Sequence, residues 1–237
     1  MRIAIALVMI FFALPAGAQD TAQTQALLQF AANNARFDKT VSDRARTVFN
    51  RQFPGCGKID RLVRQLPQAL SPLTFPPAAN TDKFPAPMQG LWIEHIKIRA
   101  CSRVQQVNLL AAGKADGEVV MLPLLPGDTR ADPAIQRESE RIASAAVVKS
   151  DSDCSDAPVI ANTRFLSFKG TNETLSQTDT GQGWFEEWEY RFCQKMVTTQ
   201  LAFTPNTEGA VQVKARPAVI TTDSGAKAAR VAPRSSP

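Results

Sequence analysis

Trp92-Ile-Glu94-His-Ile-Lys-Ile-Arg99-Ala-Cys101 returns further along the chain as Trp184-Phe-Glu186-Glu-Trp-Glu-Tyr-Arg191-Phe-Cys193. Aligned without gaps, the two stretches share Trp, Glu, Arg and Cys, and the positions three and five before each Cys are apolar or aromatic. A sequence segment that recurs in this way, here called the repeated phrase, is typical of a duplicated structural unit. The repeat therefore predicts an architecture of two copies of one small unit, and it assigns no activity.

Side chains alternate along both stretches in the pattern of a strand with one buried face. Two polar residues follow each cysteine, and an apolar-rich run comes next, over residues 104–110 and 196–203. Strand, tight turn and strand predict an antiparallel β-hairpin in each copy. The faces predicted to point inward consist of Trp92, Glu94, Ile96, Ile98 and Ala100 in the first copy and of Trp184, Glu186, Trp188, Tyr190 and Phe192 in the second.

A helix is predicted ahead of each hairpin. Residues 40–53 begin with a capping pattern at Thr40 and carry an apolar stripe at helical spacing. Residues 132–149 begin with Asp132, a good N-cap, followed by a proline at the first helical position. A further N-terminal helix is expected over residues 19–36, because apolar residues there also recur at helical spacing.

The predicted fold class is α+β. We expect two duplicated helix-plus-hairpin units, over residues 37–115 and 128–215, that share one antiparallel sheet and are stapled by disulfides. If the two hairpins pair in that sheet about a pseudo-twofold axis, Lys97 and Glu189 become cross-strand neighbours, which is a favourable pairing of opposite charges.

Residues 1–18 have the pattern of a secretory signal peptide. Arg2 supplies a positive start, residues 3–14 form a short apolar core, and residues 16–18 read Ala-Gly-Ala, which predicts cleavage before Gln19. The apolar run is shorter than the roughly 20 residues that span a membrane. The sequence therefore predicts a protein of the bacterial periplasm, or a secreted one, without a transmembrane segment.

The cysteines are four in number, which fits a disulfide framework in an exported chain. Spacing alone leaves three pairings open. The repeat favours one of them, because Cys101 and Cys193 are equivalent and each has one cysteine upstream. We expect Cys56–Cys101 and Cys154–Cys193. No metal or other cofactor is expected, because the sequence contains no close cysteine pair, His–Cys cluster or nucleotide-binding motif.

The net charge of +5 comes mostly from the C-terminal end. Residues 214–237 contain a single acidic residue, Asp223, whereas the rest of the mature chain is close to neutral. Small, polar and basic residues over 216–237 predict a disordered tail that can touch anionic surfaces. A neutral folded part gives no indication of a nucleic-acid partner. The basic residues of this end are Lys214, Arg216, Lys227, Arg230 and Arg234.

The second copy resembles a motif of an uncharacterised family of proteobacterial exported proteins. The resemblance rests on Trp184-Phe-Glu-Glu-Trp188, four further residues and Cys193, followed by Phe-Thr-Pro205. In that family a Gly typically follows the cysteine, whereas Ser102 and Gln194 stand there in this chain. The resemblance covers only the hairpins. It implies an exported protein that contains a hairpin, and no known activity comes with it.

Two carboxylates are the catalytic candidates that the sequence offers, although no residue is assigned to catalysis. Glu94 and Glu186 lie on the aromatic faces, where a charge is costly to bury without a partner. One hypothesis places both in one cleft as the general acid and base of an envelope hydrolase, as in glycoside hydrolysis. In the other, each accepts hydrogen bonds from backbone groups or from an arginine of its own copy.

Three tryptophans, Trp92, Trp184 and Trp188, are the binding candidates, because they can form a platform on which a sugar or peptide stacks. Aromatic residues at every second strand position are also typical of a core. The single histidine, His95, has no nucleophile motif beside it. We predict a non-catalytic exported protein that binds an unknown envelope protein or polymer through its hairpin surface or its tail, with the hydrolase as the alternative.

Overall fold

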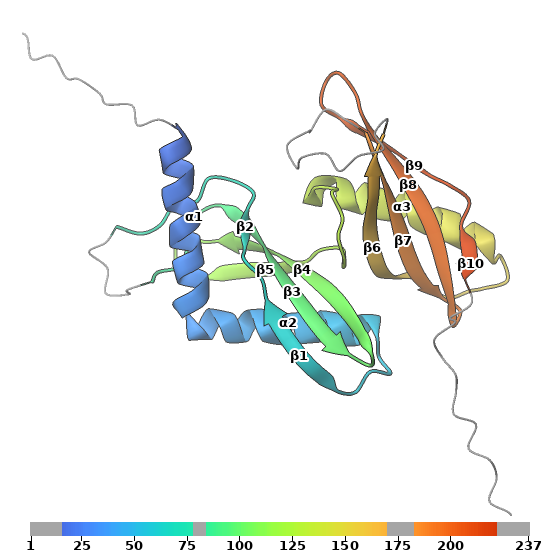
Figure 1. Ribbon diagram of the computed structural model, residues 1–237, viewed down its shortest axis with the longest axis horizontal. Helices are drawn as coiled ribbons and strands as arrows, with labels where there is room; N and C mark the ends of the chain where they lie inside the picture. The colour runs from blue at the N-terminus through green and yellow to red at the C-terminus, as the bar shows by residue number, and fades with distance from the viewer. Residues whose placement is uncertain (1–15, 78–83, 170–182, 222–237) are drawn as a thin grey trace, which may run out of the picture. The chain divides into compact units, whose positions relative to one another are not determined.

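The computed structural model of the chain describes residues 16–77, 84–169 and 183–221 (Figure 1). These described residues form three helices and ten strands, and the strands make up two five-stranded sheets, so the predicted class, α+β, is confirmed. The chain divides into two compact units. One comprises Met1–Val41, Leu66–Glu94 and Leu110–Leu122, and the other comprises Ser42–Gln65, His95–Leu109 and Pro123–Pro237.

The first sheet has the strand order β1-β3-β4-β5, with the short β2 paired to β3. Its strands are β1 (Ile59–Arg64), β2 (Gln68–Ala69), β3 (Leu91–Ala100), β4 (Arg103–Gly113) and β5 (Val119–Pro123). The predicted inward face of β3 is confirmed, because alternate side chains from Trp92 to Ala100 are fully buried. Apolar residues at every second position thus form one wall of a core, as the period of a strand requires.

The second sheet has the order β10-β8-β7-β6, with β9 also paired to β8. Its strands are β6 (Val159–Phe168), β7 (Trp184–Phe192), β8 (Lys195–Pro205), β9 (Val211–Ala215) and β10 (Val219–Thr221). Helix α3 (Pro133–Ser150) contributes Ala143 and Val147 to the core that the aromatic face of β7 also lines. The helix lies against this sheet in Figure 1. The predicted inward face of β7 is therefore confirmed as well.

Capping side chains mark the N-terminal ends of two of the described helices. The side chain of Asp132 accepts hydrogen bonds from two backbone N–H groups of the first turn of α3, as predicted. The predicted boundary between the first two helices is wrong. α1 (Ala16–Asn33) is followed by Asn34, whose side chain accepts from Phe37 N–H and caps α2 (Ala35–Gln52). Thr40 lies inside α2, where its hydroxyl donates to the carbonyl of Arg36.

Both predicted hairpins and both predicted disulfides are present. β3 and β4, like β7 and β8, are joined by two residues with positive φ, between 47° and 63°. Positive φ at both loop residues is the geometry of a type I′ turn, which matches the twist of the flanking strands. Cys56–Cys101 and Cys154–Cys193 each join the segment after a helix to the first loop residue of a hairpin.

The prediction of one shared sheet is wrong, because the two hairpins belong to separate sheets. Lys97 pairs with Val63 of β1, whereas Glu189 pairs with Asn162 of β6 and Thr198 of β8. The predicted contact between Lys97 and Glu189 is wrong for the same reason. Each hairpin instead pairs with a third strand of its own, which we call its closing strand: β1 pairs with β3, and β6 pairs with β7. The repeated phrase contains neither of these strands.

A connecting segment, residues 124–128, hydrogen-bonds to one strand of each sheet. The N–H of Gly127 donates to the carbonyl of Gln106 in β4 at 2.9 Å. The N–H of Asp128 donates to the carbonyl of Thr163 in β6 at 2.8 Å. Gly127 has a φ of 89°, and a Cβ at this position would overlap the Thr163 carbonyl. The segment therefore needs glycine at this point.

The chain ends lie partly outside the described residues, which exclude 1–15 and 222–237. The predicted cleavage point before Gln19 falls in the first turn of α1. The tail predicted from residue 216 begins too early, because β10 pairs with β8 as a short strand of β-branched residues. None of the helices that the structure describes is both long and apolar enough to span a membrane.

Candidate functional site

Glu186 lies on the buried face of β7 and is 0% exposed. Its Oε1 accepts hydrogen bonds from Trp184 Nε1 at 2.8 Å and from the backbone N–H of Arg130 at 2.7 Å. Its Oε2 accepts from Trp188 Nε1 and from the Thr129 hydroxyl, at 2.8 Å each. Donors thus fill both carboxylate oxygens, which offsets the cost of burying the group.

Glu94 of β3 is likewise 0% exposed, and its Oε1 accepts a hydrogen bond from Trp92 Nε1 at 2.8 Å. Residues two apart in a strand point to the same face, so the indole reaches the carboxylate directly, as Trp184 does in β7. The Trp92 ring also packs 6.4 Å from Phe30 and 6.2 Å from Phe37, measured between ring centroids. This glutamate belongs to an aromatic cluster of the core.

Both glutamates are therefore acceptors buried within the core. In the described part of the chain, Glu186 accepts from two indole N–H groups, a hydroxyl and one backbone N–H. The backbone donor was expected, whereas the expected arginine side chain is not among these four. A side chain without solvent exposure does not line an open cleft. The geometry favours the structural interpretation that the sequence left open, and it gives an acid–base pair no support.

The three candidate tryptophans are also core residues. Trp92 and Trp188 are 0% exposed, and Trp184 is 8% exposed. Trp184 stacks on Phe203, with ring centroids 4.7 Å apart and planes within 2° of each other. The same Phe203 ring lies 6.4 Å from Trp188. Since other side chains cover the rings, they do not offer a stacking platform to a sugar or peptide.

Thr129 and Arg130 are partners of Glu186 that the sequence did not predict. They precede it by 57 and 56 residues and lie in the segment that leads into α3. No periodicity connects positions so far apart, so pattern analysis has no means of pairing them. The one nearby signal in the sequence is the N-cap at Asp132, which marks where this segment ends and α3 begins.

His95 is half-buried on the outer face of β3. Its Nδ1 lies 2.8 Å from Asn108 Oδ1 in β4. The amide of Asn108 donates in turn to the carbonyls of Leu125 and Gly127, at 2.7 and 2.9 Å. The imidazole therefore belongs to a polar network that ties the hairpin to the connecting segment, which is a structural role.

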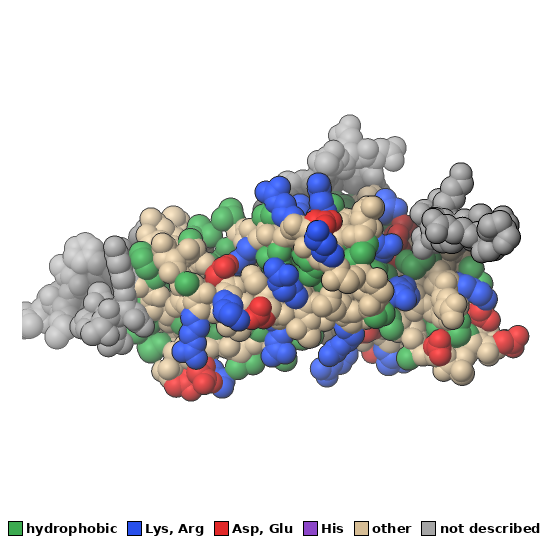
Figure 2. All heavy atoms as spheres, turned by 90° about the horizontal axis from the view of Figure 1, so that it is seen from below, with side chains coloured by type: hydrophobic (Ala, Val, Ile, Leu, Met, Phe, Trp, Pro, Cys, Tyr) green, Lys and Arg blue, Asp and Glu red, His purple; other side chains and the backbone are tan. Residues whose placement is uncertain are grey.

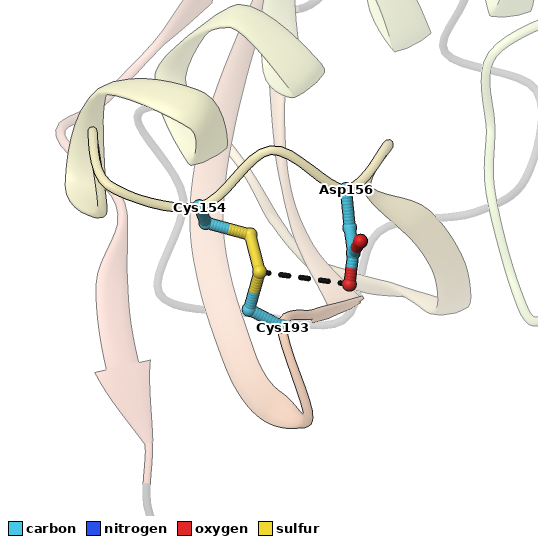
Figure 3. A group of neighbouring side chains, drawn as sticks. All are labelled: Cys154, Asp156 and Cys193. Atoms are coloured by element: carbon cyan, nitrogen blue, oxygen red, sulfur yellow. Dashed lines mark hydrogen bonds between the residues drawn. A yellow bond between two sulfur atoms is a disulfide. The ribbon is translucent and has the colours of Figure 1, made fainter.

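A cluster of potential metal ligands surrounds the second disulfide (Figure 3). The Asp156 carboxylate points toward the bond and approaches Cys193 Sγ to 3.6 Å, as the figure shows. Both sulfurs are committed to the Cys154–Cys193 bond, so neither is available as a thiolate. One carboxylate is too few ligands for a tetrahedral metal site.

A groove of about 760 Å³ runs over the outer face of β7 and β8 beside β10. Its lining includes the acidic Glu187 and Glu189 and the guanidinium groups of Arg103 and Arg216. Glu187 forms an ion pair with Arg164 at 2.6 Å, which raises the pKa of that guanidinium. A shallow groove with charges of both signs suits the binding of a polar partner better than it suits a reaction that needs an enclosed, water-excluding site.

Comparisons with models of protein families, with curated proteins and with solved structures find no match to this chain. The function must therefore be argued from the site alone.

Proposed function

We propose that this protein is exported and acts as a non-catalytic binding module of the bacterial envelope, in the periplasm or secreted. Two disulfides support export, because such bonds persist in oxidising compartments. The signal-peptide pattern of residues 1–18 and the resemblance of the hairpins to exported proteobacterial proteins point to the same compartment. Cleavage before Gln19 is part of the proposal.

The burial of Glu186 carries the non-catalytic part of the proposal. Its two oxygens are occupied by four hydrogen-bond donors, and the side chain has no exposed surface. A general acid or base must come within hydrogen-bond reach of its substrate. The hydrolase alternative, which needs Glu94 and Glu186 in one open cleft, therefore gains no observation in its favour.

We also propose that the chain carries two copies of one unit, as the repeated phrase predicts. In both copies a tryptophan donates to the glutamate two positions later in the strand. In both copies a cysteine with positive φ begins the turn and is bonded to the segment that follows a helix. Shared local chemistry of this kind supports duplication even though the closing strands differ in length.

Crosslinking in intact envelopes, followed by affinity purification, tests the proposed function. The mature protein is compared with Glu94→Gln and Glu186→Gln variants at a temperature where all three are folded. We expect one discrete crosslinked partner, captured in equal yield by each protein. If no specific crosslink forms, or if a purified sample hydrolyses envelope glycans and loses that activity in both variants, the proposed function is wrong.

A further inference from the structure

Charge is unevenly distributed over the folded part, although its total is close to neutral. Within the second compact unit, residues 42–65 and 95–109 contain the acidic residues Asp43 and Asp60 alone. Figure 2 shows Lys and Arg side chains on the surface in view, with scattered acidic side chains among them. The basic residues of the two segments are Arg44, Arg46, Arg51, Lys58, Arg61, Arg64, Lys97, Arg99 and Arg103.

Three of these residues share the outer face of the first sheet and form what we call the basic face: Arg61, Lys97 and Arg99. Arg61 of β1 is the direct cross-strand partner of Arg99 in β3, and Lys97 lies two residues from Arg99 on the same side of the strand. All three are exposed. Like charges placed directly opposite each other across two strands are destabilising.

The basic face lacks the neutralisation seen elsewhere in the same unit. On the second sheet, Arg164 of β6 lies opposite Glu187 of β7, and the two form an ion pair at 2.6 Å. Across the described part of the chain, Arg61, Lys97 and Arg99 take part in no ion pair. A repulsive cluster that the fold leaves uncompensated is expected where an anionic partner supplies the missing charge.

Apolar side chains lie among these cations. Val63 is the cross-strand partner of Lys97 and is 39% exposed. Val104 is 59% exposed and lines one shallow hollow together with Lys97, Asp128 and Arg164. Cations interspersed with exposed aliphatic groups suit the surface of a bilayer, where phosphates lie just above hydrocarbon. A nucleic-acid surface offers the phosphates without the hydrocarbon.

We propose that the basic face docks on a membrane surface containing anionic phospholipid. The proposal rests on the proposed function and specifies the chemistry of one partner. Each basic residue held near an anionic bilayer contributes about fivefold to the partition coefficient, so the three together contribute about 100-fold. Screening by salt weakens such attraction, and binding is therefore strongest at low ionic strength.

The test is cosedimentation of the mature protein with vesicles of phosphatidylcholine alone and of phosphatidylcholine mixed with phosphatidylglycerol. One variant carries Arg61→Gln, Lys97→Gln and Arg99→Gln. The matched control carries three equal losses of charge at exposed positions of α2, namely Arg44→Gln, Arg46→Gln and Arg51→Gln. We expect binding to the anionic vesicles only, a loss of about 100-fold in the basic-face variant, and wild-type binding in the α2 control to within a few fold.

Folding stability provides a second readout that does not depend on any ligand. Removing the repulsion should raise the thermal midpoint of the basic-face variant by about 1–3 °C at low salt, and the gain should shrink as salt is added. A lower midpoint would mean that the three side chains stabilise the fold, which contradicts the proposal.

Several outcomes would overturn the docking proposal. These are no binding to anionic vesicles, equal losses in the basic-face and α2 variants, or binding to duplex DNA or heparin with none to vesicles. If vesicle binding is absent while envelope crosslinking still captures a discrete partner, the docking proposal is wrong and the proposed function stands. If both are absent, both are wrong.

Discussion

At the scale of single residues, Glu186 shows why a recurring carboxylate need not be catalytic. A buried carboxylate requires donors, and the tryptophans on either side of it in β7 supply two of them within the same strand. The Trp-x-Glu-x-Trp spacing was visible in the sequence, and it places all three side chains on one face. The other two donors to Glu186, the Thr129 hydroxyl and the Arg130 N–H, come from a loop far away in sequence, so no local pattern predicts them.

Glu186→Gln should lower the free energy of unfolding by about 2–4 kcal/mol, because an amide nitrogen would face donors that the carboxylate oxygen now accepts from. Glu189→Gln on the outer face of the same strand is the control, with an expected change below about 0.5 kcal/mol. Urea unfolding followed by tryptophan fluorescence measures both. Equal effects of the two substitutions would contradict the role assigned to Glu186.

Tyr190 gives a pH prediction, because it is the single tyrosine of the chain and lies in the second core. Burial raises the pKa of its hydroxyl above the usual value of about 10. The native state therefore holds this proton more tightly than the unfolded chain does. Its contribution to stability is complete below about pH 10 and is lost as the pH rises beyond that value.

Ultraviolet titration should show tyrosinate appearing in the native protein only together with unfolding. The urea-unfolded protein should titrate near pH 10, as a free tyrosine does. Reversible ionisation near pH 10 in protein that remains folded would show that Tyr190 is accessible to solvent.

At the scale of elements, the two hairpin turns hold non-glycine residues at positive φ. A side chain in this left-handed region costs about 1–2 kcal/mol relative to glycine. Ser102→Gly and Gln194→Gly should therefore each raise the free energy of unfolding by about 1 kcal/mol, measured by urea denaturation. Ser102→Ala retains a Cβ and serves as the control. A gain with alanine equal to that with glycine would exclude backbone strain as the cause.

The disulfides should contribute stability through the unfolded state. Cys154 and Cys193 are separated by 39 residues in sequence. Replacing both with serine should lower the free energy of unfolding by about 4 kcal/mol in the chain-entropy model. Reduction of the wild-type protein with a thiol provides the comparison, and an unchanged unfolding midpoint under both conditions would refute the prediction.

The strands within the repeated phrase, their inward faces and the disulfide pairing were predictable because each follows from a local period or from the equivalence of Cys101 and Cys193. The closing strands β1 and β6 were not, since mixed polar and apolar residues such as Ile59–Arg64 lack a clear alternation. The prediction of one shared sheet was wrong for a related reason. The sequence shows that two hairpins exist, whereas the strand that pairs with each of them, β1 or β6, is set by long-range backbone hydrogen bonds that no local pattern encodes.

At the scale of the whole molecule, composition concealed the distribution of charge. The folded part is close to neutral, yet Arg61 and Arg99 lie opposite each other while Arg164 lies opposite Glu187. Only the register of the strands distinguishes these cases. The Trp and Glu that the two stretches share lie in the buried cores, whereas their outer faces differ in charge: Lys97 of β3 aligns with Glu189 of β7.

The yield of envelope crosslinks for Glu186→Gln, relative to wild type at a temperature where both are folded, tests one claim about the whole molecule. The claim is that the repeated phrase is structural and that binding belongs to the outer faces. It predicts wild-type yield despite a lower unfolding midpoint. A variant that unfolds at the wild-type midpoint and yet loses its crosslinks would contradict the claim.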